Sequence, residues 1–224
     1  MKLIVISDTH GMHRELDSMP DGDVLIHCGD FSNVGERYQI MDFIEWFTSF
    51  PHKHKIFIAG NHDKSFDPKY WKSPIDKLWK KDTLYYAETK GLIYLENSET
   101  VIDGVKFWGS PITPSFFSDF WAFNADRGET IKQYWEAIPS DTDVLITHGP
   151  PAHRLDWCMG GDLVGCEDLT YEIERIQPIF NLFGHIHESY GVEQDLHTTY
   201  VNASLLNHRY SMVNSPVELK LNNE

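Results

Sequence analysis

Basic residues are scarce in this chain of 224 residues. It has 19 lysines and arginines against 34 aspartates and glutamates, which gives a formal net charge of −15. Proteins that bind nucleic acids usually carry a basic face that neutralises phosphates, so we do not expect an extended nucleic acid as a partner. An acidic composition still permits phosphate chemistry, because bound metal ions can supply positive charge locally.

Cysteines and long apolar runs are also few. The three cysteines, Cys28, Cys158 and Cys166, are an odd number and too few for a disulfide framework. The apolar run at residues 3–6 is too short for the core of a signal peptide. No apolar run approaches the ~18 residues that a membrane span needs. These absences predict a reducing, cytoplasmic location and no association with a membrane.

Internal repeats, low-complexity tracts and Gly/Ser-rich linkers are absent as well. Hydrophobic residues make up 41% and charged residues 24% of the chain, values near the globular norm. This composition excludes disordered, collagen-like and coiled-coil proteins. Residues 1–224 are predicted to form a single domain, and the sequence leaves open whether two copies form a homodimer.

Short apolar, β-branched segments predict buried strands that alternate with helices. One helix is indicated by apolar residues at i, i+3, i+4 and i+7 from Ile40, and it ends before Pro51. Further helices are predicted at residues 129–137 and 168–176. This alternation favours an α/β domain with partly parallel pairing. The strands predicted in this way are residues 2–7, 24–27, 55–59, 144–147 and 179–183.

The middle and the C-terminal part of the chain predict further strands. Asp103-Gly104 is a hairpin signal between two short strand candidates. The segment 64–86, which contains Pro68 and Pro74, is predicted to be loop and helix near the mouth of a site. We therefore expect two sheets with helices outside them. The additional strands are predicted at residues 92–95, 100–102, 105–108, 198–202 and 210–221.

Polar residues follow each of the five buried strands. In open α/β sheets, ligands bind beyond the carboxyl ends of strands, so these residues can converge on one site. Residues i and i+2 of an extended segment point to the same side, which lets Asp8 and His10 share one centre, as His185 and His187 can. The clusters are Ser7-Asp8-Thr9-His10-Gly11, His27-Cys28-Gly29-Asp30, Ala59-Gly60-Asn61-His62-Asp63, Thr147-His148-Gly149-Pro150-Pro151 and Phe183-Gly184-His185-Ile186-His187.

The collected side chains are carboxylates, imidazoles and one amide. No cysteine lies where a ligand is needed, which disfavours a structural zinc site. The mixed nitrogen and oxygen set suits divalent Mn, Fe, Zn, Co or Ni. Taken singly, each cluster also fits an ordinary turn or a hydrogen-bonded histidine at a strand end. Their joint occurrence, each after an apolar strand, indicates a metal site.

The ordered motifs Asp-x-His, Gly-Asp, Gly-Asn-His-Asp, His-Gly and Gly-His-x-His resemble those of the calcineurin-like metallophosphoesterase superfamily. The resemblance spans residues 7–188. It implies a four-layer α/β/β/α sandwich with two mixed β-sheets and a dinuclear metal site at the carboxyl ends of the strands. A closer resemblance is to the metallophosphoesterase-domain (MPPED) branch. It rests on Ser7-Asp8-Thr9-His10, His27-x-Gly29-Asp30-Phe31, Trp108-Gly109-Ser110-Pro111, Phe123-Asn124, Arg127-Gly128, Thr147-His148-Gly149-Pro150-Pro151, Val164-Gly165-Cys166, His187-Glu188-x-Tyr190-Gly191 and Asn202-Ala203-Ser204.

The resemblance implies a role for each site residue. His62 would be a catalytic residue beside the metals without binding them, and Asp63 would orient it. Every ligand position of the family pattern is occupied, so the sequence shows no sign of a lost site. The implied ligands are Asp8, His10 and His187 for one metal, Asn61, His148 and His185 for the other, and Asp30 for both.

The mechanism follows from this ligand set. Two metals about 3.5–4 Å apart can share a water and lower its pKa toward neutrality. The resulting hydroxide would attack phosphorus in line with the leaving oxygen, to which His62 would donate a proton as general acid. In protein phosphatases of the superfamily, the second motif resembles Gly-Asp-x-Val-Asp-Arg-Gly. Here no arginine follows Asp30 closely, which disfavours a phosphoprotein substrate.

The resemblance to the MPPED branch implies a small phosphodiester substrate, including 2′,3′- or 3′,5′-cyclic nucleotides. Asn33 is a candidate to bind a phosphate oxygen, or else to cap a helix near Glu36. Arg154 is the nearest candidate cation, or else a surface arginine. Two alternatives stay open, a small-molecule phosphomonoesterase and a non-catalytic metal-binding scaffold of the same fold. Aromatic residues that can border the site are Phe31, Phe66, Trp108, Phe116, Phe117 and Trp121.

Overall fold

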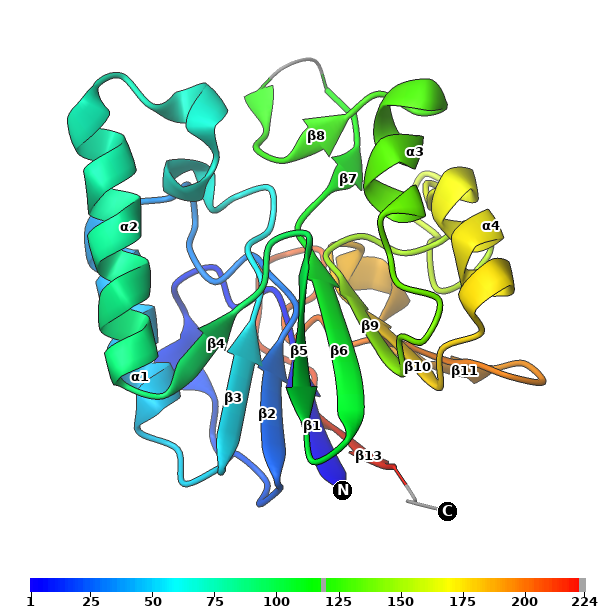
Figure 1. Cartoon of the computed structure of the whole chain (residues 1–224), viewed down its shortest axis with the longest axis horizontal. Helices are drawn as coiled ribbons and strands as arrows, with labels where there is room; N and C mark the ends of the chain where they lie inside the picture. The colour runs from blue at the N-terminus through cyan, green and yellow to red at the C-terminus, as the bar shows by residue number, and fades with distance from the viewer. Residues whose placement is uncertain (118–119, 222–224) are drawn as a thin grey trace.

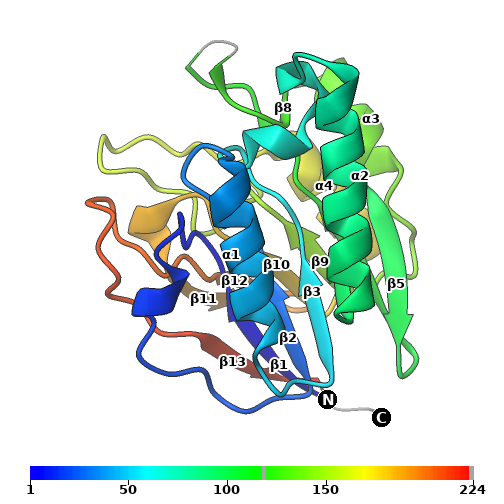
Figure 2. The same cartoon turned by 90° about the vertical axis from the view of Figure 1, so that its left-hand side faces the viewer.

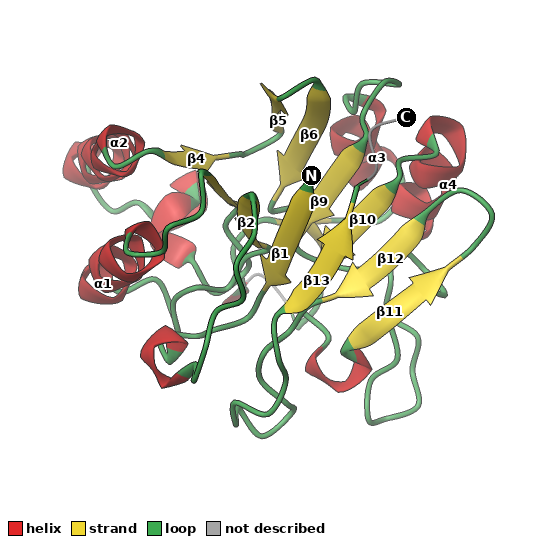
Figure 3. Ribbon diagram, turned by 90° about the horizontal axis from the view of Figure 1, so that it is seen from below, coloured by secondary structure: helices red, strands yellow, loops and turns green. Residues whose placement is uncertain are grey.

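Two β-sheets lie face to face at the centre of the protein (Figures 1 and 3). The computed structural model describes residues 1–117 and 120–221. The first sheet has five strands in the order β13-β1-β2-β3-β4, and the second has six in the order β11-β12-β10-β9-β6-β5. Both sheets are mixed: β1 pairs in parallel with β2 and antiparallel with β13, and β10 pairs in parallel with β9 and β12 while β11 runs antiparallel to β12.

The strand bounds follow the apolar segments closely. The first sheet contains β1 (Lys2–Ile6), β2 (Val24–His27), β3 (His54–Phe57), β4 (Leu92–Tyr94) and β13 (Val217–Lys220). The second contains β5 (Ser98–Ile102), β6 (Val105–Ser110), β9 (Val144–Thr147), β10 (Phe180–Phe183), β11 (Gly191–Gln194) and β12 (Thr199–Asn202). A short pair is formed by β7 (Thr113–Pro114) and β8 (Asn124–Ala125).

Helices cover the outer faces of both sheets. Helices α1 (Arg37–Thr48) and α2 (Pro74–Thr89) lie on the first sheet, and α3 (Glu129–Glu136) and α4 (Glu167–Ile176) lie on the second (Figures 1 and 2). The expected four-layer α/β/β/α sandwich is therefore confirmed. Short 3₁₀ turns occur at His13–Glu15, Lys64–Phe66, Pro68–Tyr70 and His187–Ser189.

Alternation along the strands divides the core into layers. Leu3 and Val5 of β1 belong to the apolar cluster between the sheets, together with Phe107 and Ile146 of the second sheet. Ile4 and Ile6, on the other side of β1, belong to the cluster that includes the buried face of α1. Because successive side chains of a strand point to opposite faces, a strand with helices on one side and a sheet on the other is apolar throughout.

Several local expectations differ from the structure. The predicted strand at 210–221 forms only over Val217–Lys220, and the preceding loop places Tyr210 in the left-handed region, at φ 57°. The segment 64–86, by contrast, has the expected loop and helix: it contains most of α2, which begins after a capping box between Ser73 and Asp76. Strand β11 was not expected.

Within the described residues, no helix is long and apolar enough to cross a membrane.

The topology brings the polar clusters together. Strands β1, β2 and β3 run parallel in one sheet, and β9 and β10 run parallel in the other. Backbone hydrogen bonds continue beyond the strand ends, from Asp8 N–H to the Gly29 carbonyl and from Gly184 N–H to the His148 carbonyl. The five loops that carry the predicted ligands therefore meet at one edge of the sandwich.

Candidate metal centre and substrate pocket

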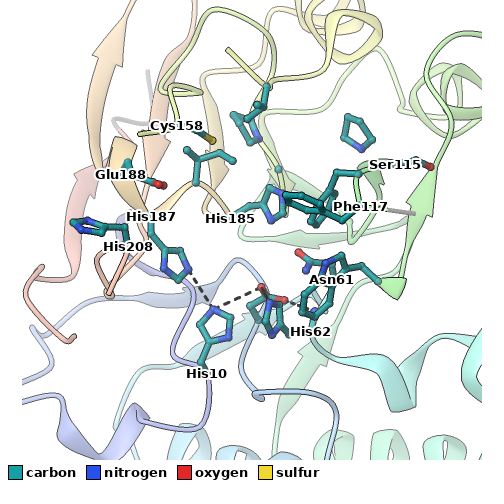
Figure 4. A pocket seen from close by; sticks show the side chains of 18 of the residues that line it. His10, Asn61, His62, Ser115, Phe117, Cys158, His185, His187, Glu188 and His208 are labelled. Carbon is teal, nitrogen blue, oxygen red and sulfur yellow. Dashed lines mark hydrogen bonds and ion pairs between the residues drawn. The ribbon is translucent and has the colours of Figure 1, made fainter. Parts of the chain in front are cut away.

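Three side chains from opposite ends of the sequence meet first. Asp8, His10 and His187 each place one ligand atom within 4.8 Å of the others, and all three are largely buried. His187 Nε2 lies 3.4 Å from Asp8 Oδ1 and 3.2 Å from His10 Nε2. Figure 4 shows the His10 and His187 rings side by side at the base of a pocket. Such converging imidazole and carboxylate atoms are a ligand set for a divalent metal.

A second group lies beside the first. Asp30, His148 and His185 also have ligand atoms within 4.8 Å of one another. His148 Nε2 lies 2.9 Å from the Asn61 amide oxygen and 3.3 Å from Asp30 Oδ2. The same Asp30 oxygen lies 3.7 Å from His10 Nε2 in the first group. The structure thus brings all seven predicted ligands together, with the Asp30 carboxylate between the two groups.

The hydrogen bonds behind the ligands fit metal binding. A carbonyl only accepts, so His148 Nδ1–H donates to Cys28 O at 2.9 Å and His187 Nδ1–H donates to Asn207 O at 3.1 Å. This leaves Nε2 of both rings directed at the centre, as in metal sites whose outer hydrogen bonds fix the histidine tautomer. Asp8 Oδ1 is buried and has no hydrogen-bond partner in the described part of the chain. A divalent cation would satisfy it.

The backbone is shaped to bring these side chains close. Asp8, His10, Asp30 and His185 all have positive φ, between 44° and 68°, which is uncommon for non-glycine residues and concentrates at functional sites. Gly184 has no space for a side chain, since a Cβ there would lie 2.0 Å from Asp8 Oδ2. The backbone at these loops therefore adopts uncommon conformations that bring the ligand side chains together.

Burial and charge set the protonation of the ligands. Burial lowers the pKa of His10 and of His185 to about 3, so both rings are neutral and can donate a lone pair. Burial also opposes the charge of His148, but the adjacent Asp30 carboxylate raises the pKa of that ring to about 9. Metal binding at His148 must therefore displace a proton, which makes metal affinity depend on pH.

The residue Ser204 was not expected from the sequence as part of the site. Its hydroxyl donates to Asp8 Oδ2 at 2.8 Å, and the His185 backbone N–H donates to the same oxygen at 2.9 Å. Asp8 Oδ1 is thereby turned toward His187. Ser204 follows β12 in the Asn202-Ala203-Ser204 motif, and that position after a buried strand was the available signal.

His62 also lies at the centre, but Asp63 does not orient it. His62 Nδ1–H donates to the backbone carbonyl of Asn33, and its Nε2 lies 4.0 Å from Asp30 Oδ2. The buried Asp63 carboxylate instead accepts from Gly60 N–H at 2.8 Å and from the Ser32 hydroxyl at 2.6 Å. Burial, together with the charge of Asp30, raises the pKa of Asp63 to about 7. Asp63 therefore fixes the loops around His62, and the Asn33 carbonyl holds Nδ1 of its ring.

Neither predicted substrate-binding side chain reaches the pocket. Asn33 is exposed, and among the described residues it contributes to the site through its backbone carbonyl. Arg154 pairs with Asp195 at 3.1 Å and lies 4.7 Å from the centre of the Tyr200 ring. Arg127 lines the pocket instead and donates to the carbonyls of Val164 and Gly165. Its place in the Arg127-Gly128 motif was the signal for it.

Five of the seven ligands, His10, Asp30, Asn61, His185 and His187, line a cavity of about 480 Å³, and Asp8 and His148 are fully buried beside them. Of the aromatic residues expected at its border, Phe31, Phe66 and Trp108 are buried in the core. Figure 4 shows Phe117 and Ser115 on one side of the cavity and Cys158, Glu188 and His208 on the other. We define the floor as Asp8, His10, Asp30, Asn61, His148, His185 and His187, and the rim as Phe116, Phe117, Trp121, Cys158, Glu188, His208 and Tyr210.

The family model for calcineurin-like phosphoesterases matches residues 1–189. The chain belongs to this family. It is 40% identical to human metallophosphoesterase domain-containing protein 1 over 98% of this chain and 71% of that protein. It is also 40% identical to the UPF0046 protein K07C11.7 of Caenorhabditis elegans over 97% of this chain and 74% of that protein. This calcineurin-like phosphoesterase is thus an enzyme, and its clustered histidines and aspartates are a set of side chains that could hold a divalent metal.

Solved structures share the fold at low sequence identity. The phosphopantetheinyl hydrolase PptH of Mycobacterium tuberculosis matches with a TM-score of 0.60 and 14% identity, over 93% of this chain and 90% of that one. The protein TT1561 of Thermus thermophilus matches with a TM-score of 0.58 and 14% identity, over 90% of this chain and 88% of that one. These likenesses support the four-layer fold.

Proposed function

We propose that this phosphoesterase hydrolyses small phosphodiesters with two divalent metals held on the floor of the pocket. One metal would bind Asp8, His10 and His187, and Asp30 would bridge it to the second. The observation that carries this proposal is the place of Asp30, whose Oδ2 faces His148 at 3.3 Å and His10 at 3.7 Å. Asn61, His148 and His185 would complete the second site.

Bound divalent metals would acidify a water nucleophile and neutralise charge on the phosphate oxygens, and Mn, Fe, Zn, Co and Ni all suit the donor set. The chain's own contribution is the proton at His62. Because Nδ1–H of His62 is held by the Asn33 carbonyl, only Nε2 faces the floor. As the water oxygen bonds to phosphorus, the bond from phosphorus to the leaving oxygen breaks, and a protonated Nε2 donates its proton to that oxygen.

The residues of the rim favour a phosphodiester, which carries an organic group on each side of the phosphate, over a phosphomonoester. Glu188 lines the pocket and has no hydrogen-bond partner among the described residues, so its carboxylate disfavours a phosphomonoester dianion more than a diester monoanion. Opposite it, the rings of Phe116 and Phe117 form an apolar wall that suits a flat ring such as a nucleobase. We infer that 2′,3′- and 3′,5′-cyclic nucleotides are the substrates to test first.

The test compares hydrolysis of bis(p-nitrophenyl) phosphate and p-nitrophenyl phosphate. The protein is stripped of metal, refilled with Mn²⁺ and assayed beside an Asp30→Ala variant. We expect diester turnover that requires metal and is lost in the variant, followed by activity on a panel of cyclic nucleotides.

A higher kcat/KM for the monoester would replace the proposal with a small-molecule phosphomonoesterase. Diester turnover that survives in the Asp30→Ala variant would contradict the assignment of Asp30. A metal content of one ion per chain in the active protein would contradict the dinuclear centre.

A further inference from the structure

The imidazole of His62 is enclosed on two sides. The indole of Trp121 stacks on its face, with ring centroids 4.1 Å apart and an interplanar angle of 29°. The edge of His10 meets it from another side, at 4.4 Å and 80°. With the Asn33 carbonyl on Nδ1, these contacts leave Nε2 as the part of the ring that faces the floor.

Trp121 is itself tied to the loop that carries His62. The N–H of Ala122 donates to the carbonyl of Asn61 at 3.1 Å, so the residues beside each ring are joined through the backbone. The N–H of Phe123 donates to the Asp67 carboxylate at 2.7 Å. On its outer side, the indole lies 4.6 Å from the Lys64 ammonium group. Trp121 therefore has a fixed place relative to His62.

The hydrogen bond at Nδ1 alone does not fix the plane of the ring, since the imidazole can pivot about that bond. Stacking against a large flat surface removes this freedom and excludes water from one face of the ring. Proton transfer needs the donor within about 2.6–3.2 Å of the leaving oxygen, and a misplacement of about 1 Å can cost 10²-fold in rate. The plane of the His62 ring therefore matters for catalysis.

We propose that Trp121 is a positioning residue that holds His62 in the orientation for protonating the leaving group. The inference rests on the proposed function, in which His62 is the general acid. It has a specific kinetic consequence. An acidic phenol leaves as the phenolate without help, whereas a weakly acidic phenol or alcohol requires the proton. Loss of Trp121 should therefore slow the reaction most for the least acidic leaving groups.

The experiment measures kcat/KM for a series of methyl aryl phosphate diesters whose phenols differ in acidity. The Mn²⁺-loaded wild type is compared with Trp121→Ala, Trp121→Leu, Trp121→Phe and His62→Ala. Trp121→Leu keeps apolar volume without a flat face, and Trp121→Phe keeps a flat face. The control is Trp157→Ala, which removes an indole that is 46% exposed from another loop near the pocket.

We expect Trp121→Ala and Trp121→Leu to be slowed roughly 10- to 100-fold with the least acidic phenol and little with the most acidic. In these two variants, the slope of log kcat/KM against the pKa of the phenol should be steeper than in the wild type. The slope should be steepest in His62→Ala, and in Trp121→Phe it should return toward the wild-type value. Metal content and circular dichroism should match the wild type, and Trp157→Ala should keep the wild-type slope.

Three outcomes would overturn the inference. If Trp121→Ala and Trp121→Leu slow every diester equally, Trp121 acts in substrate binding or stability and does not position His62. If His62→Ala steepens the slope and the Trp121 variants do not, the positioning role fails while the general acid stands. If His62→Ala keeps the wild-type slope, the general acid of the proposed function fails and the inference fails with it.

Discussion

The floor and the rim of the pocket differ in how the chain holds them. Floor residues follow parallel strands directly, and their carboxylates are fixed by backbone and hydroxyl donors, as Asp8 is by His185 N–H and Ser204. Rim residues lie in the loops that surround the ligands, and Phe117 is 84% exposed. Buried, hydrogen-bonded groups tolerate little change, whereas exposed loop residues are free to vary. The comparison indicates that the floor fixes the metal chemistry and that the rim selects the substrate, apart from Trp121, for which we propose a role in positioning His62.

Removing a floor carboxylate should have the largest effect. Asp30→Asn keeps the size of the side chain and removes the charge that faces both groups of ligands. We expect activity on every phosphodiester to fall by at least the ~10²–10⁴-fold that a general acid supplies, together with metal content measured by mass spectrometry. The matched rim variant, Glu188→Gln, should keep its metal. Equal metal content in both variants would contradict the division between floor and rim.

A smaller loss, of metal affinity, is expected when a hydrogen bond that holds a floor ligand is removed. Ser204→Ala deletes the hydroxyl that donates to Asp8 Oδ2 at 2.8 Å. Outer hydrogen-bond partners of metal ligands are typically worth 10–100-fold in metal affinity, so Mn²⁺ affinity should fall by about that factor. Calorimetric titration measures it, with Ser211→Ala in an exposed loop as the control. Unchanged affinity in Ser204→Ala would show that Asp8 is held without this hydroxyl.

The buried histidine behind the floor should make stability depend on pH. Burial lowers the pKa of His27 to about 3, below the value near 6.5 of an unfolded histidine. Its contribution to the free energy of unfolding is complete above pH 6.5 and is lost as the pH falls toward 3, because only the unfolded chain takes up the proton. In His27→Gln, the slope of the free energy of unfolding against pH should be smaller by about 1.4 kcal/mol per pH unit between pH 6 and 4.

Urea unfolding of the metal-free protein measures this slope and separates it from metal release. The exposed His197 provides the control, since His197→Gln removes no buried ring. A wild-type slope in His27→Gln would mean that His27 is accessible to protons in the folded protein.

The smallest effect is expected at Arg154. Its ion pair with Asp195 is partly exposed, and such pairs contribute about 0.2–1 kcal/mol. Arg154→Ala should therefore lower the free energy of unfolding by less than about 1 kcal/mol and leave KM for the diester unchanged. Arg127→Ala, which removes a residue of the pocket lining, is the comparison. A raised KM in Arg154→Ala would return Arg154 to the substrate site.

Expectations from the sequence were accurate where the chain is regular. The segments 24–27 and 144–147 form strands with those bounds, because their apolar character extends over the whole segment. The segment 210–221 differs from the expected strand: its apolar residues resemble a strand, but Tyr210 packs against His10 and His187, with ring centroids 5.0 and 5.1 Å away. These contacts join residues far apart in the sequence, so the local pattern of apolar residues does not predict them.

The sequence by itself determined the chemistry of the floor. A strand, its glycine-containing turn and the ligand that follows are neighbours along the chain, so Asp30 or His185 can be recognised from local order and residue type. Only the tertiary structure decided that the Asn33 carbonyl holds His62 where Asp63 was expected, and that Trp121 stacks on the same ring. Such contacts join loops from different parts of the chain, and their geometry depends on the packing of both sheets beneath them.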